Sequence, residues 1–207
     1  MNNNLDNIYT STLPEEERIA ERDLQIYSNA IKGLAESQSP LHFGNRNHKH
    51  ASVVISTIFD YSEKEIVFYE DDFTGNISKN NNIQCIEESL VNFIGRNGKI
   101  QFVLKENNNK LSKFGKKVKL YNELLPENVI VKKASNTFKE YIIEKKGDIF
   151  FIVGDQKMYR VEDNIINEEG FRKGTAYGSF NQPETAKELY DVFIEKLSTC
   201  EDYFLKE

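Results

Sequence analysis

Three consecutive residues, His48-Lys49-His50, carry the side chains that are best suited to chemistry near neutral pH. Imidazole changes its protonation state close to pH 7, so His48 and His50 could act as a general acid and a general base. Lys49 and the nearby Arg46 could hold phosphate oxygens, and the third histidine, His42, lies in the same stretch. An exposed polar connector is the commoner origin of such a pattern. The segment is therefore a candidate catalytic and ligand-binding site. The alternative is that it is an exposed connector with no catalytic or binding role.

An acidic run, Glu70-Asp71-Asp72, directly follows a predicted strand. Carboxylates together with His48 or His50 could bind a divalent metal ion. Consecutive acidic residues in a loop are more often solvated surface. We therefore expect no metal site and no cofactor.

Lysines are concentrated in the middle of the chain. Residues 105–146 contain 11 Lys and 5 Glu, a local balance of +6 within a chain of net charge −6. A lysine strip with interleaved aromatic residues could track phosphates. Its members are Lys110, Lys113, Phe114, Lys116, Lys117, Lys119 and Tyr121. The overall acidity argues against this, so nucleic-acid binding is a possible function that the net charge does not support.

Apolar spacing predicts how these residues are positioned. The expected helices cover residues 12–36, 83–95, 120–125 and 183–197, and a further helix is expected to begin at residue 51. Strands are expected at residues 65–69, 99–104, 129–131, 139–144, 149–153 and 158–161. Residues 106–119 are expected to form a loop, and Thr12 is expected to cap the first helix. Repeated helix-strand units followed by hairpins predict a mixed, partly parallel sheet flanked by helices.

The length of 207 residues fits one domain with a helical N-terminal extension. The mean hydropathy is −0.59, and no apolar run approaches the roughly 20 residues that a membrane-spanning helix needs. Cys85 and Cys200 lack the spacing of metal ligands. We expect a cytoplasmic protein without a membrane partner.

Two segments resemble parts of the phospholipase D-like superfamily. Residues 97–104, Asn-Gly-Lys followed by an apolar run, are similar to the start of an inner strand of that fold. Residues 149–161 are similar to its hairpin, and Gly178-Ser179-Phe180-Asn181 resembles its Gly-Ser-x-Asn element. The resemblance implies that Ser179 and Asn181 contact phosphate or another ligand. Capping of the following helix is the alternative for this pair.

Active members of the superfamily carry the motif His-x-Lys-x-x-x-x-Asp. If Asp155 is the aspartate of that motif, Asp148 stands at the histidine position and Phe150 at the lysine position. A carboxylate repels phosphate and a phenyl ring donates no hydrogen bond. The resemblance therefore implies a single, degenerate copy of the domain whose catalytic motif is not intact.

These observations lead to one hypothesis and one alternative. The chain is expected to comprise an N-terminal helical extension, residues 1–40, and a phospholipase D-like α/β domain, residues 41–207. We expect an interaction or sensing module without catalysis, which the resemblance associates with bacterial phage-defence or mobile-element systems. A homodimer through the first helix or a sheet edge, or a larger protein complex, would be its partner arrangement. The alternative is a nuclease or phosphodiesterase that uses His48 and His50 at a dimer interface.

Overall fold

The computed structural model describes residues 14–45, 47–73, 83–106, 111–163 and 176–204. The helices in these ranges are α1 (Glu15–Glu36), α2 (His48–Tyr61), α3 (Ile83–Gly95), α4 (Lys113–Leu124), α5 (Asn136–Lys146) and α6 (Pro183–Leu197). The strands are β1 (Phe43–Asn45), β2 (Glu65–Glu70), β3 (Lys99–Leu104), β4 (Val129–Lys133), β5 (Ile149–Gly154), β6 (Met158–Asp163), β7 (Ala176–Ser179) and β8 (Glu201–Asp202).

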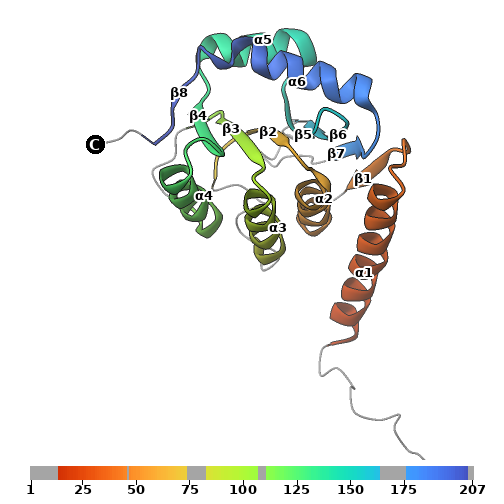
Figure 1. Cartoon of the computed structure of the whole chain (residues 1–207). Helices are drawn as coiled ribbons and strands as arrows, with labels where there is room; N and C mark the ends of the chain where they lie inside the picture. The colour runs from red at the N-terminus through yellow and green to blue at the C-terminus, as the bar shows by residue number, and fades with distance from the viewer. Residues whose placement is uncertain (1–13, 46, 74–82, 107–110, 164–175, 205–207) are drawn as a thin grey trace, which may run out of the picture.

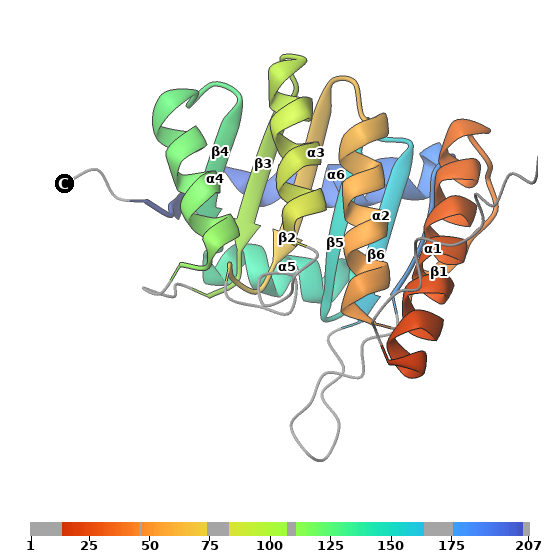
Figure 2. The same ribbon diagram turned by 90° about the horizontal axis from the view of Figure 1, so that it is seen from below.

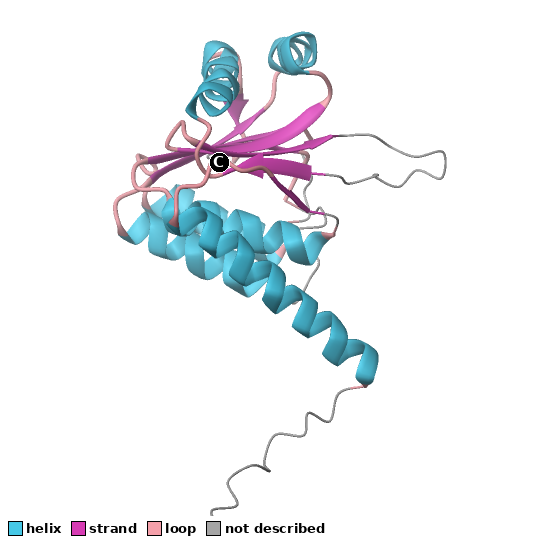
Figure 3. Cartoon of the chain, turned by 90° about the vertical axis from the view of Figure 1, so that its right-hand side faces the viewer, coloured by secondary structure: helices cyan, strands magenta, loops and turns pink. Residues whose placement is uncertain are grey.

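The strands form one mixed sheet in the order β1-β7-β6-β5-β2-β3-β4-β8. The neighbours β2, β3 and β4 are parallel, and every other pairing is antiparallel. Helices α1 to α4 cover one face of the sheet, and α5 and α6 cover the other (Figures 1 and 3). The predicted fold class, a partly parallel α/β sheet flanked by helices, is confirmed.

The core consists of two apolar clusters, which lie on opposite faces of the sheet. One includes Ile66 and Phe102 with the apolar faces of α2 and α3, and the other includes Val67 and Val103 with α5 and α6. Strand β5 is buried at every position, as expected for an inner strand that is covered by helices on both faces. The short strands β1 and β8, three and two residues long, are the two edge strands of the sheet.

Two predicted elements are wrong. Lys139–Glu144 was predicted as a strand but belongs to α5, where Phe138 and Ile142, four residues apart, are buried on one face. Ser135 caps this helix by accepting a hydrogen bond from the Phe138 amide, and Gly147 with φ of 85° ends it. The lysine-rich stretch predicted as a loop contains most of α4, which buries Phe114 and Val118.

Helix α1 packs on α2 through its C-terminal half, where Ile31 and Ala35 are buried. The predicted helix end at Glu36 is confirmed, whereas Thr12, its predicted cap, lies outside the described residues. The predicted domain boundary at residue 40 stays a prediction. Among the described residues, no helix combines the length and hydropathy that crossing a membrane requires.

Candidate functional site

The carboxyl ends of β2 and β3 lie beside the start of β5, because β5 runs antiparallel to β2 (Figure 2). The parallel ladder continues beyond both strands. The Lys105 amide donates to the Glu70 carbonyl at 2.8 Å, and the Glu106 amide donates to the Asp71 carbonyl at 2.8 Å. Ligands of open α/β sheets bind at such carboxyl ends, so these strand ends are a candidate site.

An ion pair and a buried aromatic cluster lie at these strand ends. Lys105 Nζ lies 3.1 Å from Asp148 Oδ1 and 5.7 Å from the centre of the Phe150 ring. Phe150 is only 1% exposed, and its ring centre lies 5.6 Å from that of Tyr69. Burial raises the pKa of the Tyr69 hydroxyl, with a smaller contribution from Asp148. The Lys105–Asp148 ion pair thus lies beside a buried aromatic cluster.

Asp155 lies at the other end of β5, where it holds the turn that leads into β2. Its carboxylate accepts hydrogen bonds from the backbone amides of Glu63, Lys64 and Glu65 at 2.7, 2.9 and 3.0 Å. Asp155 itself has φ of 49°, in the left-handed region that Asp and Asn tolerate better than most residues. This residue connects the hairpin to the central strand.

The three histidines do not share one site. His48 is exposed in the first turn of α2, next to the exposed Lys49. His50 stacks on Tyr27 of α1, with ring centres 3.8 Å apart and planes inclined by 9°. His42 lies elsewhere, with Nδ1 3.4 Å from the Tyr159 hydroxyl.

The surroundings of His50 favour its neutral form. Burial lowers the pKa of its imidazole, and the negative charge of Asp23 partly opposes this effect. Asn47 caps α2 by accepting a hydrogen bond from the His50 amide at 2.9 Å. Arg46, the predicted phosphate contact beside these residues, lies outside the described residues.

Ser179 and Asn181 lie at the opposite end of the strands from Asp148. Ser179 pairs with Tyr159, which pairs with Val153 near the end of β5. With a rise of about 3.3 Å per residue, this places Ser179 roughly 17 Å along the sheet from Asp148. The structure therefore does not bring this predicted ligand-binding pair to the strand-end site.

The same two residues do not cap α6. The residue at its N-cap is Gln182, which makes no capping hydrogen bond through its side chain, so the predicted cap is wrong. Instead, the Asn181 side-chain amide donates to the Gln38 carbonyl at 2.8 Å. Asn181 thus ties the segment before α6 to the end of α1.

Sequence reasoning missed a buried charged residue, Arg160 of β6, which is 2% exposed. Its Nε donates to Asn45 Oδ1 at 3.0 Å, and its guanidinium pairs with Glu162. Burial raises the pKa of the nearby Tyr27 to about 12, although the positive charge of Arg160 opposes the shift. The available signal was an arginine inside an apolar strand, where a charge requires a partner.

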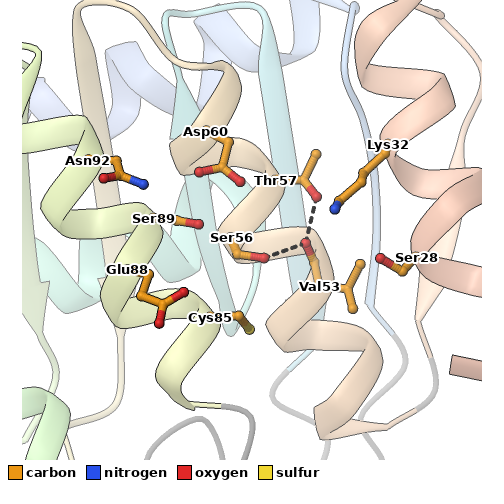
Figure 4. A pocket seen from close by; sticks show the side chains of 10 residues that line it. All are labelled: Ser28, Lys32, Val53, Ser56, Thr57, Asp60, Cys85, Glu88, Ser89 and Asn92. Atoms are coloured by element: carbon orange, nitrogen blue, oxygen red, sulfur yellow. Dashed lines mark hydrogen bonds between the residues drawn. The ribbon is translucent and has the colours of Figure 1, made fainter. Parts of the chain in front are cut away.

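A groove of about 280 Å³ lies between α1, α2 and α3 (Figure 4). Its lining is mostly polar and comprises Ser28, Lys32, Val53, Ser56, Thr57, Asp60, Cys85, Glu88, Ser89 and Asn92. Ser56 and Thr57 donate their hydroxyl hydrogen bonds to the Val53 carbonyl within α2. Burial raises the pKa of Asp60, while Ser89, Arg96 and Lys32 oppose the shift.

The acidic run at the end of β2 does not assemble a metal site with the histidines among the residues that the structure describes. Among the described residues, no group of three or more His, Cys, Asp or Glu side chains could hold a metal ion. Glu70, Asp71 and Asp72 are all partly buried and make interactions within the chain.

Comparison with known proteins identifies the fold. No family model and no curated protein matches the sequence. Among solved structures, TrmBL2, an archaeal chromatin protein that binds DNA, is similar with a TM-score of 0.55 and 17% identity, over 90% of this chain and 66% of that chain. The chain thus spans slightly less than two thirds of TrmBL2.

Two further solved structures are also similar. Nuc from Salmonella typhimurium, a phospholipase D family member, has a TM-score of 0.52 and 14% identity over 80% of this chain and 97% of Nuc. NucT from Helicobacter pylori has a TM-score of 0.50 and 12% identity over 78% of this chain and 99% of NucT. The chain therefore has a phospholipase D-like fold.

Proposed function

We propose that this chain is a catalytically inactive phospholipase D-like domain that works by binding a partner, as an interaction or sensing module. The observation that carries the proposal is the ion pair of Lys105 with Asp148 beside the buried ring of Phe150. In this proposal Asp148 and Phe150 occupy the positions at which an active relative has its histidine and lysine.

The chemistry of these side chains supports the proposal. Displacement at phosphorus requires a nucleophile and cationic groups that stabilise the negative charge of the transition state. Asp148 would repel a phosphate, and the ammonium group of Lys105 is only 3.1 Å from that carboxylate. Phe150 is 1% exposed and has no group that could donate to an oxygen. A phosphodiester would thus meet a compensated ion pair and an apolar ring where catalysis requires a nucleophile and a cationic clamp.

The alternative function, a nuclease that uses His48 and His50, is favoured by one observation. Burial lowers the pKa of His50, which favours the neutral imidazole that a general base must have. Against this, one face of the His50 ring is covered by Tyr27, which limits its access to a substrate.

A hydrolysis assay distinguishes the two functions. The purified chain and its His48→Ala and His50→Ala variants are incubated with bis(p-nitrophenyl) phosphate and with single- and double-stranded DNA, and an active phospholipase D-type nuclease serves as the positive control. We expect no hydrolysis above the buffer rate for any of the three proteins. Cleavage by the wild type that disappears in either histidine variant would contradict the proposal and support the nuclease.

A further inference from the structure

Helices α1 and α4 are the two outermost helices of the four-helix layer (Figures 1 and 2). Both expose large apolar side chains. Ile19 and Ile26 of α1 are 54% and 58% exposed, and Leu120 and Leu124 of α4 are 50% and 64% exposed. Single exposed apolar residues are ordinary, but pairs that share a helix face indicate a contact surface.

The exposed pair on α1 points away from the rest of the chain. Seven residues, nearly two helical turns, separate Ile19 from Ile26, so both lie on one face. Ile26 precedes the buried Ile31 by five residues, which places it about 140° around the helix from the side that packs on the domain. The first turns of α1 project beyond the other helices (Figure 3). A projecting helical segment of this length is marginally stable in water unless another surface covers it.

The exposed pair on α4 adjoins lysines. Lys113, Lys116, Leu120 and Leu124 follow steps of three and four residues and share one face, whereas Phe114 and Val118 are buried on another. Lys113 has 79% of its side chain exposed, although it lies 3.9 Å from Glu87. The surface of α4 is therefore basic in its first half and apolar in its second.

The two helices carry opposite charges. Helix α1 contains six acidic and three basic side chains, a balance of −3, and its first turn is Glu15-Glu16-Glu17. Helix α4 contains four lysines and one glutamate, a balance of +3. The step from Glu15 to Ile19 equals the step from Lys116 to Leu120. A parallel alignment thus sets Glu15 against Lys116 and Ile19 against Leu120 at the same time, while Leu124 comes opposite Asp23 and Ile26 extends past the end of α4.

We infer that α1 of one copy of this chain docks in parallel on α4 of a second copy, and that the reciprocal contact closes a dimer. Helices α1 and α4 begin at the same edge of the sheet, so they run in the same direction within one chain (Figure 2). A two-fold axis along that direction therefore makes both contacts simultaneously. Sheet edges are poorer interfaces, because β1 and β8 provide only three and two residues. This inference names the partner for the proposed binding function and rests on it.

The mass in solution tests the dimer. Light scattering of the full chain across a concentration series should give twice the chain mass of 24.0 kDa. The α1 variant, Ile19→Glu with Ile26→Glu, and the α4 variant, Leu120→Glu with Leu124→Glu, should each weaken dimerisation about tenfold or more. Ile143→Glu on α5, where Ile143 is 48% exposed, is the matched control and should leave the dimer intact. Circular dichroism verifies that each variant is folded.

Mixing the variants tests which surfaces meet. A homodimer of either variant lacks both contacts, whereas a mixed dimer keeps one intact contact between the unmodified α1 and the unmodified α4. We expect the mixture to dimerise more tightly than either variant alone. Charge exchange gives a second measurement: Glu15→Lys with Glu16→Lys should weaken the dimer, and adding Lys113→Glu with Lys116→Glu should restore it.

Clear results would overturn the inference. A wild-type chain that stays monomeric at every concentration excludes the dimer, and an α4 variant that dimerises like the wild type excludes α4 as the contact. A mass above two chains excludes the closed arrangement. None of these results depends on hydrolysis, so a catalytic activity would defeat the proposed function while leaving the measured mass unchanged.

Discussion

Asp155 shows how much one side chain contributes to this fold. Its carboxylate accepts three backbone amides from the turn before β2, which lies about 90 residues earlier in the sequence. Hydrogen bonds to a charged group are stronger than those between neutral groups. The turn at Asp155 therefore fixes where the β5–β6 hairpin joins the parallel strands.

We expect Asp155→Asn to lower the free energy of unfolding by about 2 kcal/mol, because the charge is lost while the left-handed backbone remains tolerated. Urea denaturation measures the change. The control is Asp148→Ala, which removes the partner of Lys105 in a partly exposed ion pair and should cost about 1 kcal/mol or less. Equal losses in the two variants would show that the charge of Asp155 adds no more to stability than the Lys105–Asp148 ion pair does.

The sequence singled out His50 but could not reveal what covers it. Tyr27 stacks on this imidazole from a helix 23 positions earlier, and no local pattern encodes a contact between two separate helices. The same limit applies to Ser179, whose resemblance to a motif element was local while its position depends on the pairing of β7 with β6. The chemical groups that these residues offer could be predicted from the sequence. The residues that surround them in the fold could not.

Among the elements, β7 depends on a glycine. A methyl group at Gly178 would lie 2.1 Å from the Tyr159 carbonyl oxygen and 2.7 Å from the Phe43 ring. At Gly44, on the strand paired with β7, the nearest atom to an added methyl group is 3.8 Å away. The space for a side chain thus differs sharply between two neighbouring positions of the sheet.

Gly178→Ala should therefore destabilise the chain by about 3 kcal/mol, near the upper end for overpacking, because a backbone carbonyl cannot rotate away as a side chain can. Gly44→Ala is the control and should change stability by less than about 1 kcal/mol. Thermal unfolding followed by circular dichroism compares the two. A Gly178→Ala variant as stable as the control would mean that β7 can move to make room for the methyl group without loss of stability.

Long, periodic elements were predictable from the sequence, and short or charged ones were not. The helix at Ile83–Gly95 and the strand at Lys99–Leu104 have apolar patterns that match their burial. The apolar trio Tyr141, Ile142 and Ile143 suggested a strand, but only Ile142 of the three is buried, on the same face of α5 as Phe138. β1 and β8 are too short to produce a pattern, since tertiary pairing alone defines them.

Across the whole molecule, the folded structure redistributes the charge that the sequence concentrates. The segment 105–146 has a local balance of +6, but acidic residues from other parts of the chain pair with it. Lys117 pairs with Glu87, Lys132 with Asp202 and Lys146 with Glu188. The lysine-rich segment is therefore far less basic on the folded surface than in the sequence.

This neutralisation predicts weak binding to nucleic acid, although the fold is shared with a DNA-binding chromatin protein. Affinity for DNA depends on lysine and arginine side chains that replace counterions along the phosphates, and a chain of net charge −6 opposes that approach. In fluorescence anisotropy with labelled single- and double-stranded DNA, we expect no saturable binding at about 0.15 M salt. The variant Glu87→Gln, which releases Lys117 from its partner at 3.0 Å, should raise the residual affinity at low salt. Dissociation constants below about 1 μM for the wild type at about 0.15 M salt would instead show that the paired lysines exchange their carboxylates for phosphates.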